Sequence, residues 1–125
     1  MRTAPEYNLY RAIAYYLRLQ YPGTLFHFDP TGLNLSKAQR GMLKAIQGPV
    51  GYPDLFIMEP RGPYHGLFIE VKPEGARLFT MKGEFASDHI KEQSEYLVKL
   101  SKLGYWACFA CGFDEAIKII KEYLG

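Results

Sequence analysis

The fold is decided by Leu67-Phe68-Ile69-Glu70-Val71-Lys72, an apolar segment that carries one acid and one base. Its aliphatic and aromatic residues predict a central, largely buried strand. Side chains alternate along a strand, so Glu70 and Lys72 point to one face and Val71 to the other. Burying a carboxylate and an ammonium group is costly, so both groups need compensating partners.

The nearest partner is Asp54, which opens a second predicted strand over residues 54–59 after Gly48, Gly51 and Pro53. The short turn region from Pro60 to Gly66 makes the two strands a hairpin and brings Asp54 beside Glu70. Two adjacent carboxylates repel, and a divalent cation removes that repulsion. Two carboxylates, a backbone carbonyl and water are ligands that Mg²⁺ accepts. The simpler alternative is that Glu70 and Lys72 face solvent on an edge strand or form an ion pair.

The other elements complete an alternating pattern. Helices are predicted over residues 5–20, 36–47, 88–103 and 113–124, and strands over 25–28, 54–59, 67–72 and 105–110. The predicted caps are Ser36 for the second helix, Ser87 or Asp88 for the third, and Gly104 at its C′ position. Asp29-Pro30-Thr31-Gly32 is expected to end the first strand as a turn. The order predicts an α/β fold, with a central mixed sheet flanked by helices in a single domain over residues 1–125.

Composition agrees with one globular domain. The chain has 125 residues, of which 48 % are hydrophobic, enough for a core without metal or disulfide crosslinks. No apolar run is long enough to span a membrane, and the N-terminus does not resemble a secretory signal. A cytoplasmic protein, without a membrane partner, is therefore expected.

Charge is unevenly distributed along the chain. Residues 1–48 hold six lysine and arginine residues against two acids, whereas residues 49–125 hold nine against eleven. Lys37, Arg40 and Lys44 fall on one side of the second helix, and its apolar side is Ala38, Met42, Leu43 and Ile46. The three cations form either a solvated face or a face that contacts phosphates.

The two cysteines, Cys108 and Cys111, form one CxxC inside the predicted strand 105–110 and its end. Zinc needs two further ligands, and a redox motif needs the thiols at a helix start. We therefore expect two reduced, packed thiols.

Two motifs carry a family resemblance. Gly51-Tyr-Pro-Asp-Leu55 and Gly66-Leu-Phe-Ile-Glu-Val-Lys72 resemble the PD-(D/E)xK nuclease superfamily, and more specifically a stand-alone VRR-NUC domain. The stretch Glu92-Gln-Ser-Glu-Tyr-Leu97, leading to Gly104, resembles the glutamine-bearing helix of that family. Glu6 lies on the first helix, where the family carries an acid. The resemblance covers most of the chain and implies a restriction-endonuclease-like core.

Site roles follow from the resemblance. It implies that Asp54, Glu70 and the Val71 carbonyl bind Mg²⁺ or Mn²⁺, and that Lys72 is the catalytic lysine. It further implies that Glu6 reaches the metal directly or through water, and that Gln93 supports the site or contacts phosphate. Glu6 also has a purely structural explanation, because acids are favoured in the first turn of a helix. Gln93 could instead be a buried amide that serves packing. Tyr96, with the three cations of the second helix, is a candidate DNA contact.

The resemblance implies a metal-dependent, structure-selective endonuclease that hydrolyses phosphodiester bonds in branched DNA such as four-way junctions. The family's stand-alone phage and bacterial members look like homodimeric enzymes, so the resemblance implies a homodimer here. No organic cofactor is expected, and the implied processes are DNA repair and recombination. Alternatives are an exonuclease, a flap or restriction-type nuclease, or a non-catalytic DNA-binding module. The apolar connection 73–86 is expected at a dimer interface or near DNA.

Overall fold

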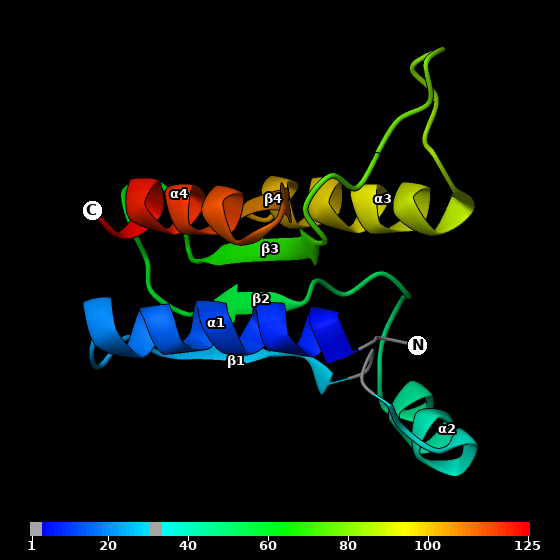
Figure 1. The fold of residues 1–125 in the computed structure, drawn as a ribbon, viewed down its shortest axis with the longest axis horizontal. Coiled ribbons are helices and arrows are strands. Elements are labelled where there is room, and N and C mark those ends of the chain that lie inside the picture. The colour runs from blue at the N-terminus through cyan, green and yellow to red at the C-terminus, as the bar shows by residue number, and fades with distance from the viewer. Residues whose placement is uncertain (1–3, 31–33) are drawn as a thin grey trace.

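The computed structural model describes residues 4–30 and 34–125, so Thr31 and Gly32 of the expected turn lie outside the described residues. The helices are α1 (Ala4–Gln20), α2 (Lys37–Ala45), α3 (Asp88–Lys102) and α4 (Phe113–Leu124). The strands are β1 (Phe26–Phe28), β2 (Leu55–Ile57), β3 (Leu67–Lys72) and β4 (Trp106–Cys111). This order is the predicted one, and the α/β prediction is confirmed (Figure 1).

The four strands form one mixed sheet in the order β1-β2-β3-β4. The pairs β1·β2 and β2·β3 are antiparallel, and β3·β4 is parallel because α3 carries the chain back between them. The predicted hairpin is therefore present, and β3 is the central strand as expected. Leu67 through Val71 are all buried.

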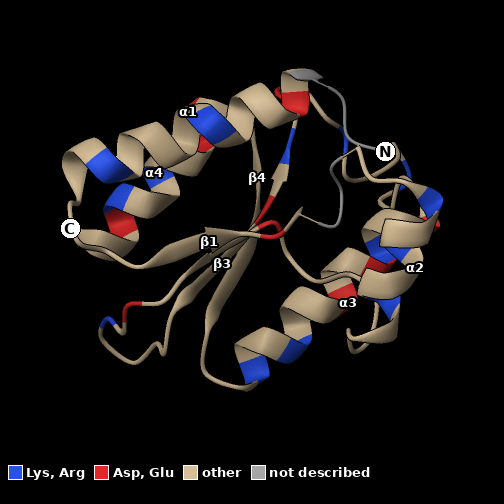
Figure 2. Cartoon of the chain, turned by 90° about the horizontal axis from the view of Figure 1, so that it is seen from below, with Lys and Arg blue, Asp and Glu red and all other residues tan. Residues whose placement is uncertain are grey.

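Helices cover both faces of the sheet (Figure 2). The main core lies between one face and the helices α1 and α4, where Ile13, Leu17 and Ile120 pack against Leu55 and Ile69. The predicted inward residues of α4 are all buried: Ala116, Ile117, Ile120 and Leu124. On the opposite face, α3 packs through Leu97 and Leu100, beside an aromatic pair in which Phe56 and Phe68 stack at 4.1 Å.

Helix capping follows the sequence closely. Ser36 caps α2 by accepting a hydrogen bond from the Gln39 N–H, and Ser87 rather than Asp88 caps α3 by accepting one from the Ile90 N–H. Gly104 follows α3 with a φ of +100°, the conformation expected of a glycine at C′. Local chemistry therefore sets where these helices begin and end.

Most element bounds differ from the predicted ones by one or two residues, and two differences concern the surroundings of the acids and of the basic helix. The strand predicted over residues 54–59 is shorter, Leu55–Ile57, so Asp54 lies just before it and residues 58–59 lie after it. In α2, which projects from the body in Figure 1, no residue of Lys37–Ala45 is buried. Its apolar side is therefore not a core face: Met42 is 70 % exposed, and Ile46 is also exposed.

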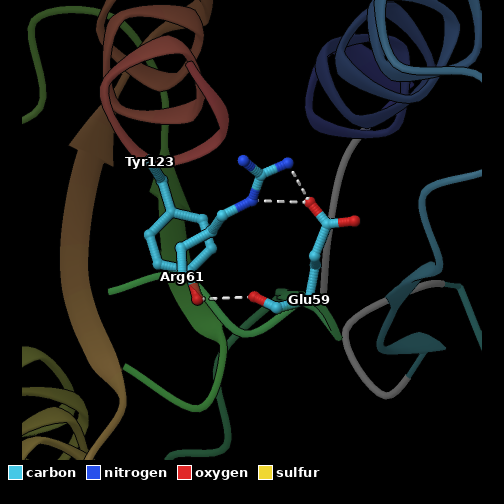
Figure 3. A network of polar contacts seen from close by, with 3 residues as sticks. All are labelled: Glu59, Arg61 and Tyr123. Atoms are coloured by element: carbon cyan, nitrogen blue, oxygen red, sulfur yellow. Dashed lines mark hydrogen bonds and ion pairs between the residues drawn. The ribbon is translucent and has the colours of Figure 1, made fainter. Parts of the chain in front are cut away.

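The turn between β2 and β3 is tied to the end of α4 (Figure 3). The Tyr123 hydroxyl donates a hydrogen bond of 2.6 Å to the Glu59 carbonyl, and the Arg61 guanidinium donates to the Glu59 carboxylate at 2.6 and 2.9 Å. The bonded turn holds the hairpin at the end of β3 that carries Leu67, away from Glu70 and Lys72.

Cys108 and Cys111 lie on β4 as half-buried free thiols. Burial raises the pKa of Cys108 to about 12, which keeps its thiol protonated near neutral pH. Among the helices that the structure describes, none has the length and apolar character needed to cross a membrane.

Candidate active site

Two buried carboxylates lie side by side on the face of the sheet that α3 covers. Leu55 pairs with Ile69, so the same antiparallel register places Asp54 opposite Glu70. Each of the two side chains is only 1 % exposed. The sequence prediction that the hairpin brings these acids together agrees with the structure.

Asp54 is held by the backbone of the central strand. Its Oδ2 accepts a hydrogen bond of 2.8 Å from the Val71 N–H. The N–H and C=O of one strand residue point to the same side, so the Val71 carbonyl also faces the side of Asp54. Because β2 begins only at Leu55, that carbonyl lies beyond the β2·β3 ladder, near the two acids.

The loop that delivers Asp54 packs directly on α3. Gly51 has a φ of +103°, and a Cβ there would lie 3.0 Å from the Glu92 carbonyl oxygen. Only glycine fits such a backbone without strain. Tyr52, the next residue, packs edge-on against Tyr96 and Phe68 with ring centroids 5.9 Å apart in each case. The glycine of the Gly51–Leu55 motif thus sets the close approach of the loop to α3.

Gln93 connects α3 to the site. Its Nε2 donates a hydrogen bond of 2.5 Å to Glu70 Oε1, and the residue is 3 % exposed. Its Oε1 is buried and has no hydrogen-bond partner among the residues that the structure describes. A buried acceptor without a hydrogen bond is unfavourable. Gln93 Oε1 is therefore suited to accept a hydrogen bond from a bound water or ligand.

A cleft of about 860 Å³ opens above the two carboxylates. Its lining includes Val71, Lys72, Gln93 and Glu6 of α1. Asp54 and Glu70 are not lining residues; they lie buried behind the lining. Tyr96, predicted to contact DNA, is half-buried in the wall.

Asp29 belongs to the same site, and sequence reasoning missed it. The register Phe28↔Leu55 continues so that Asp29 faces Asp54, and the Asp29 N–H donates 2.7 Å to the Asp54 carbonyl. Alternation from Phe28 turns the Asp29 side chain to the face of Asp54 and Glu70, and Asp29 lines the cleft. Asp29 stands in a sequence typical of a turn, so the sequence did not indicate that it lies in the site. The only available signal was its position directly after the predicted strand 25–28.

Two tyrosine hydroxyls of the cleft remain protonated near neutral pH. Burial, and then the negative charge of Asp29, raise the pKa of Tyr52 and Tyr96 above the ordinary value of 10.0. Neutral phenols can donate hydrogen bonds to phosphate oxygens. The wall of the cleft next to Asp29 therefore offers two neutral hydroxyl donors.

The remaining predicted residues lie further out. Lys37, Arg40 and Lys44 are exposed on α2, and the Arg40 guanidinium donates 3.1 Å to the Leu35 carbonyl. Ile46 and residues 47–50, which follow α2, line the cleft, so the basic helix leads into its rim. Figure 2 shows acidic positions where the strands converge in the middle of the molecule, while the helices carry both basic and acidic positions.

The donor set suits a hard divalent cation. Asp54, Glu70 and the Val71 carbonyl supply oxygen ligands of the kind that Mg²⁺ and Mn²⁺ take, and these cations keep several waters. The unmatched Gln93 Oε1 is an acceptor that such a water could use. Within residues 4–30 and 34–125, no three His, Cys, Asp or Glu side chains are grouped closely enough to form a complete metal cage. The protein would thus contribute only part of a coordination shell.

Comparison with known proteins places this arrangement in a class. No family model matches the chain, and no curated protein matches it. A solved structure does match, with a TM-score of 0.72 and 27 % identity over 99 % of this chain and 91 % of that chain. The class that the fold and the comparison define is an α/β domain of nuclease type. The matched structure is a VRR_NUC domain protein, which confirms the predicted resemblance to VRR-NUC domains.

Proposed function

We propose that this protein is a metal-dependent DNA endonuclease that hydrolyses phosphodiester bonds in branched DNA. The observation that carries the proposal is the pair of buried acids, Asp54 and Glu70, lying next to the lysine that lines the cleft, Lys72. The nuclease-type fold of the VRR_NUC domain protein supports the same chemistry.

Asp54, Glu70 and the Val71 carbonyl would hold Mg²⁺ or Mn²⁺, with Glu6 reaching the cation directly or through water. When bound, the cation supplies positive charge at the scissile phosphate and lowers the pKa of a water molecule. Glu6 lies in the first turn of α1 and lines the same cleft as Lys72 and Gln93, which suits such a role.

The chain's own residues orient the reaction. In hydrolysis, a water oxygen attacks the phosphorus, one phosphorus–oxygen ester bond breaks, and the leaving oxygen takes up a proton. Lys72 lies on the face of Glu70 and opens to the cleft, where its ammonium can position the attacking water and stabilise negative charge on the phosphate. Gln93 holds one oxygen of Glu70 and so fixes the direction of that carboxylate.

Recognition of DNA by its backbone and shape fits the surfaces around the cleft. Lys37, Arg40 and Lys44 on α2 offer cations for phosphates, and Tyr52 and Tyr96 offer neutral donors. Such contacts position a protein without reading sequence. Symmetric cleavage of a four-way junction needs two sites related by a two-fold axis, so we propose that the protein acts as a homodimer. Recombination and repair in the cytoplasm are the processes in which we expect this activity.

A cleavage assay tests the proposal. Wild type, Lys72→Ala and the control Lys118→Ala, which changes an exposed lysine on α4, are given a four-way junction, a flap and a linear duplex. Mg²⁺ or Mn²⁺ is present, with EDTA as the negative control. We expect metal-dependent cutting of the junction by wild type and Lys118→Ala, and none by Lys72→Ala.

The other outcomes separate the alternatives. Equal cutting of linear DNA would remove the preference for branches and favour an exonuclease or a restriction-type enzyme. Cutting by Lys72→Ala at the wild-type rate would reject the site. Binding of DNA without cutting of any substrate, by protein shown to be folded, would favour a non-catalytic DNA-binding module.

A further inference from the structure

The connection between β3 and α3 forms a hairpin of its own, residues 76–86, that rises from the body of the protein (Figure 1). It is internally bonded: the Thr80 N–H donates 2.7 Å to the Glu84 carbonyl, and the Ala86 N–H donates 2.9 Å to the Leu78 carbonyl. Phe79 and Phe85 pair across it and stack at 5.3 Å. The hairpin is therefore an ordered projection and not a plain connecting loop.

The tip of the hairpin presents apolar surface to solvent. Met81 is 97 % exposed and Phe79 is 51 % exposed. Met81 gains almost no stability from that position, because apolar groups stabilise a fold only where they are removed from water, whereas Phe79 is partly covered by its stack with Phe85. Apolar side chains grouped on a projection are typical of interaction sites.

The hairpin stands on the rim of the cleft. Pro73, which precedes it, and His89, which follows it, both line the cleft. Met81 lies eight positions along the chain from Pro73, so the tip reaches at most roughly 26 Å from the rim. That reach exceeds the width of either groove of duplex DNA, roughly 12 and 6 Å.

Charges near the tip favour a polyanion. Lys82 adjoins Met81, and Arg77 lies at the base of the hairpin; both are exposed. Glu84, on the returning strand, is the opposing charge within residues 76–86. One cation beside an apolar tip and a second at the base of the hairpin match a binding partner that combines phosphates with stacked, apolar base faces.

We propose that the hairpin 76–86 is a wedge that inserts Met81, backed by Phe79, between the base pairs at the branch point of the DNA held in the cleft. This inference rests on the proposed function and adds the element that would sense the branch. A branch point exposes base faces and is easier to open than a continuous stack, so an apolar side chain enters there at lower cost. The proposal favours DNA over a second copy of the chain, because so small a tip falls well short of the roughly 800 Å² per partner that stable protein interfaces bury.

Fluorescence of 2-aminopurine beside the branch point tests the wedge. The base brightens when it is unstacked, and the reading does not require cleavage. Wild type, Met81→Ser and Met42→Ser are compared at saturating protein with EDTA present. Met42 is an exposed methionine on α2, so its variant is a matched control for the loss of a surface thioether.

We expect wild type and Met42→Ser to raise the fluorescence and Met81→Ser to leave it unchanged. Met81→Ser should also bind the junction about tenfold more weakly, which corresponds to about 1.4 kcal/mol, with linear duplex affected less than twofold. Because Met81 is almost fully exposed, the substitution leaves the fold intact, and a thermal melt confirms this.

Three results would overturn the wedge. One is no fluorescence change with wild type, another is equal signals from wild type and Met81→Ser, and the third is a smaller sedimenting mass for Met81→Ser, which would assign the tip to a subunit interface. The proposed hydrolysis is judged separately. Cutting without a fluorescence change refutes only the wedge, and a fluorescence change without cutting refutes only the nuclease.

Discussion

Gly51→Ala should destabilise the protein and impair the site together, because Gly51 meets two constraints at once. Its φ of +103° is a conformation that costs an L residue about 1–2 kcal/mol. An added Cβ would also lie 3.0 Å from the Glu92 carbonyl oxygen and 3.4 Å from Tyr96 Cβ. The first neighbour is helix backbone, which cannot move aside cheaply, and such overpacking costs roughly 1–3 kcal/mol.

The two costs together predict a loss of roughly 2–5 kcal/mol in the free energy of unfolding, a large share of a small domain's stability. Urea unfolding measures it. Gly75→Ala is the matched control, because Gly75 has a φ of +79° but no heavy atom lies within 4 Å of a Cβ there. Gly75→Ala should therefore lose only the conformational part of the free energy of unfolding, about 1–2 kcal/mol.

The comparison is decisive in both directions. A loss for Gly51→Ala no larger than for Gly75→Ala would refute the close packing of the loop on α3. If the loss is larger but cleavage at a permissive temperature is unchanged, the loop does not set the position of Asp54 and the reasoning fails at that step.

Three further predictions concern the surroundings of the acids. Gln93→Leu removes the donor to Glu70 and should lower the free energy of unfolding, measured with urea, by about 2 kcal/mol. It should also lower the cleavage rate. If neither value changes, Gln93 serves only packing. Asp29→Asn should lower the pKa of Tyr52 and Tyr96, because a negative charge disfavours phenolate; a spectroscopic pH titration, with Asp88→Asn as control, would contradict this if the curves coincide. Replacing the α2 cations with alanine should weaken DNA binding and flatten its salt dependence, and an unchanged slope would remove α2 from the DNA path. These cations are Lys37, Arg40 and Lys44.

The sequence predicted the elements whose determinants are local. Helix ends are specified by short-range hydrogen bonds and backbone conformation at Ser36, Ser87 and Gly104. Ser36 and Gly104 lie at the predicted ends, and Ser87 is one of the two caps predicted for α3. Strand β3 has the predicted bounds because Gly66 and Pro73 bracket a continuous β-forming run. In α4, the apolar residues that recur at helical spacing are the ones that face the core.

The sequence failed where a partner decides the outcome. The apolar stripe of α2 indicated an amphipathic helix correctly, but periodicity does not say what covers the stripe, and Met42 and Ile46 remain exposed. The apolar connection 73–86 was predicted to lie at a dimer interface or near DNA, but the pairing of Phe79 with Phe85 that makes it a hairpin was not predicted. The sequence places Asp29 in a turn and does not predict its position in the site, because that position depends on the β1·β2 register, a long-range pairing.

The roles of the site residues remain predictions, yet their placement is hard to explain by stability alone. Apolar side chains at Asp54 and Glu70 would continue the hydrophobic pattern of two buried strands, and exchanging buried charges for packed apolar groups is often neutral or stabilising. The chain instead buries both acids and commits the Val71 N–H and the Gln93 amide to holding them. It also leaves Gln93 Oε1 as a buried acceptor with no protein partner among the described residues. An arrangement that costs stability and gathers buried polar atoms behind one cleft is what a catalytic site requires, because preorganised charge is maintained there at the expense of packing.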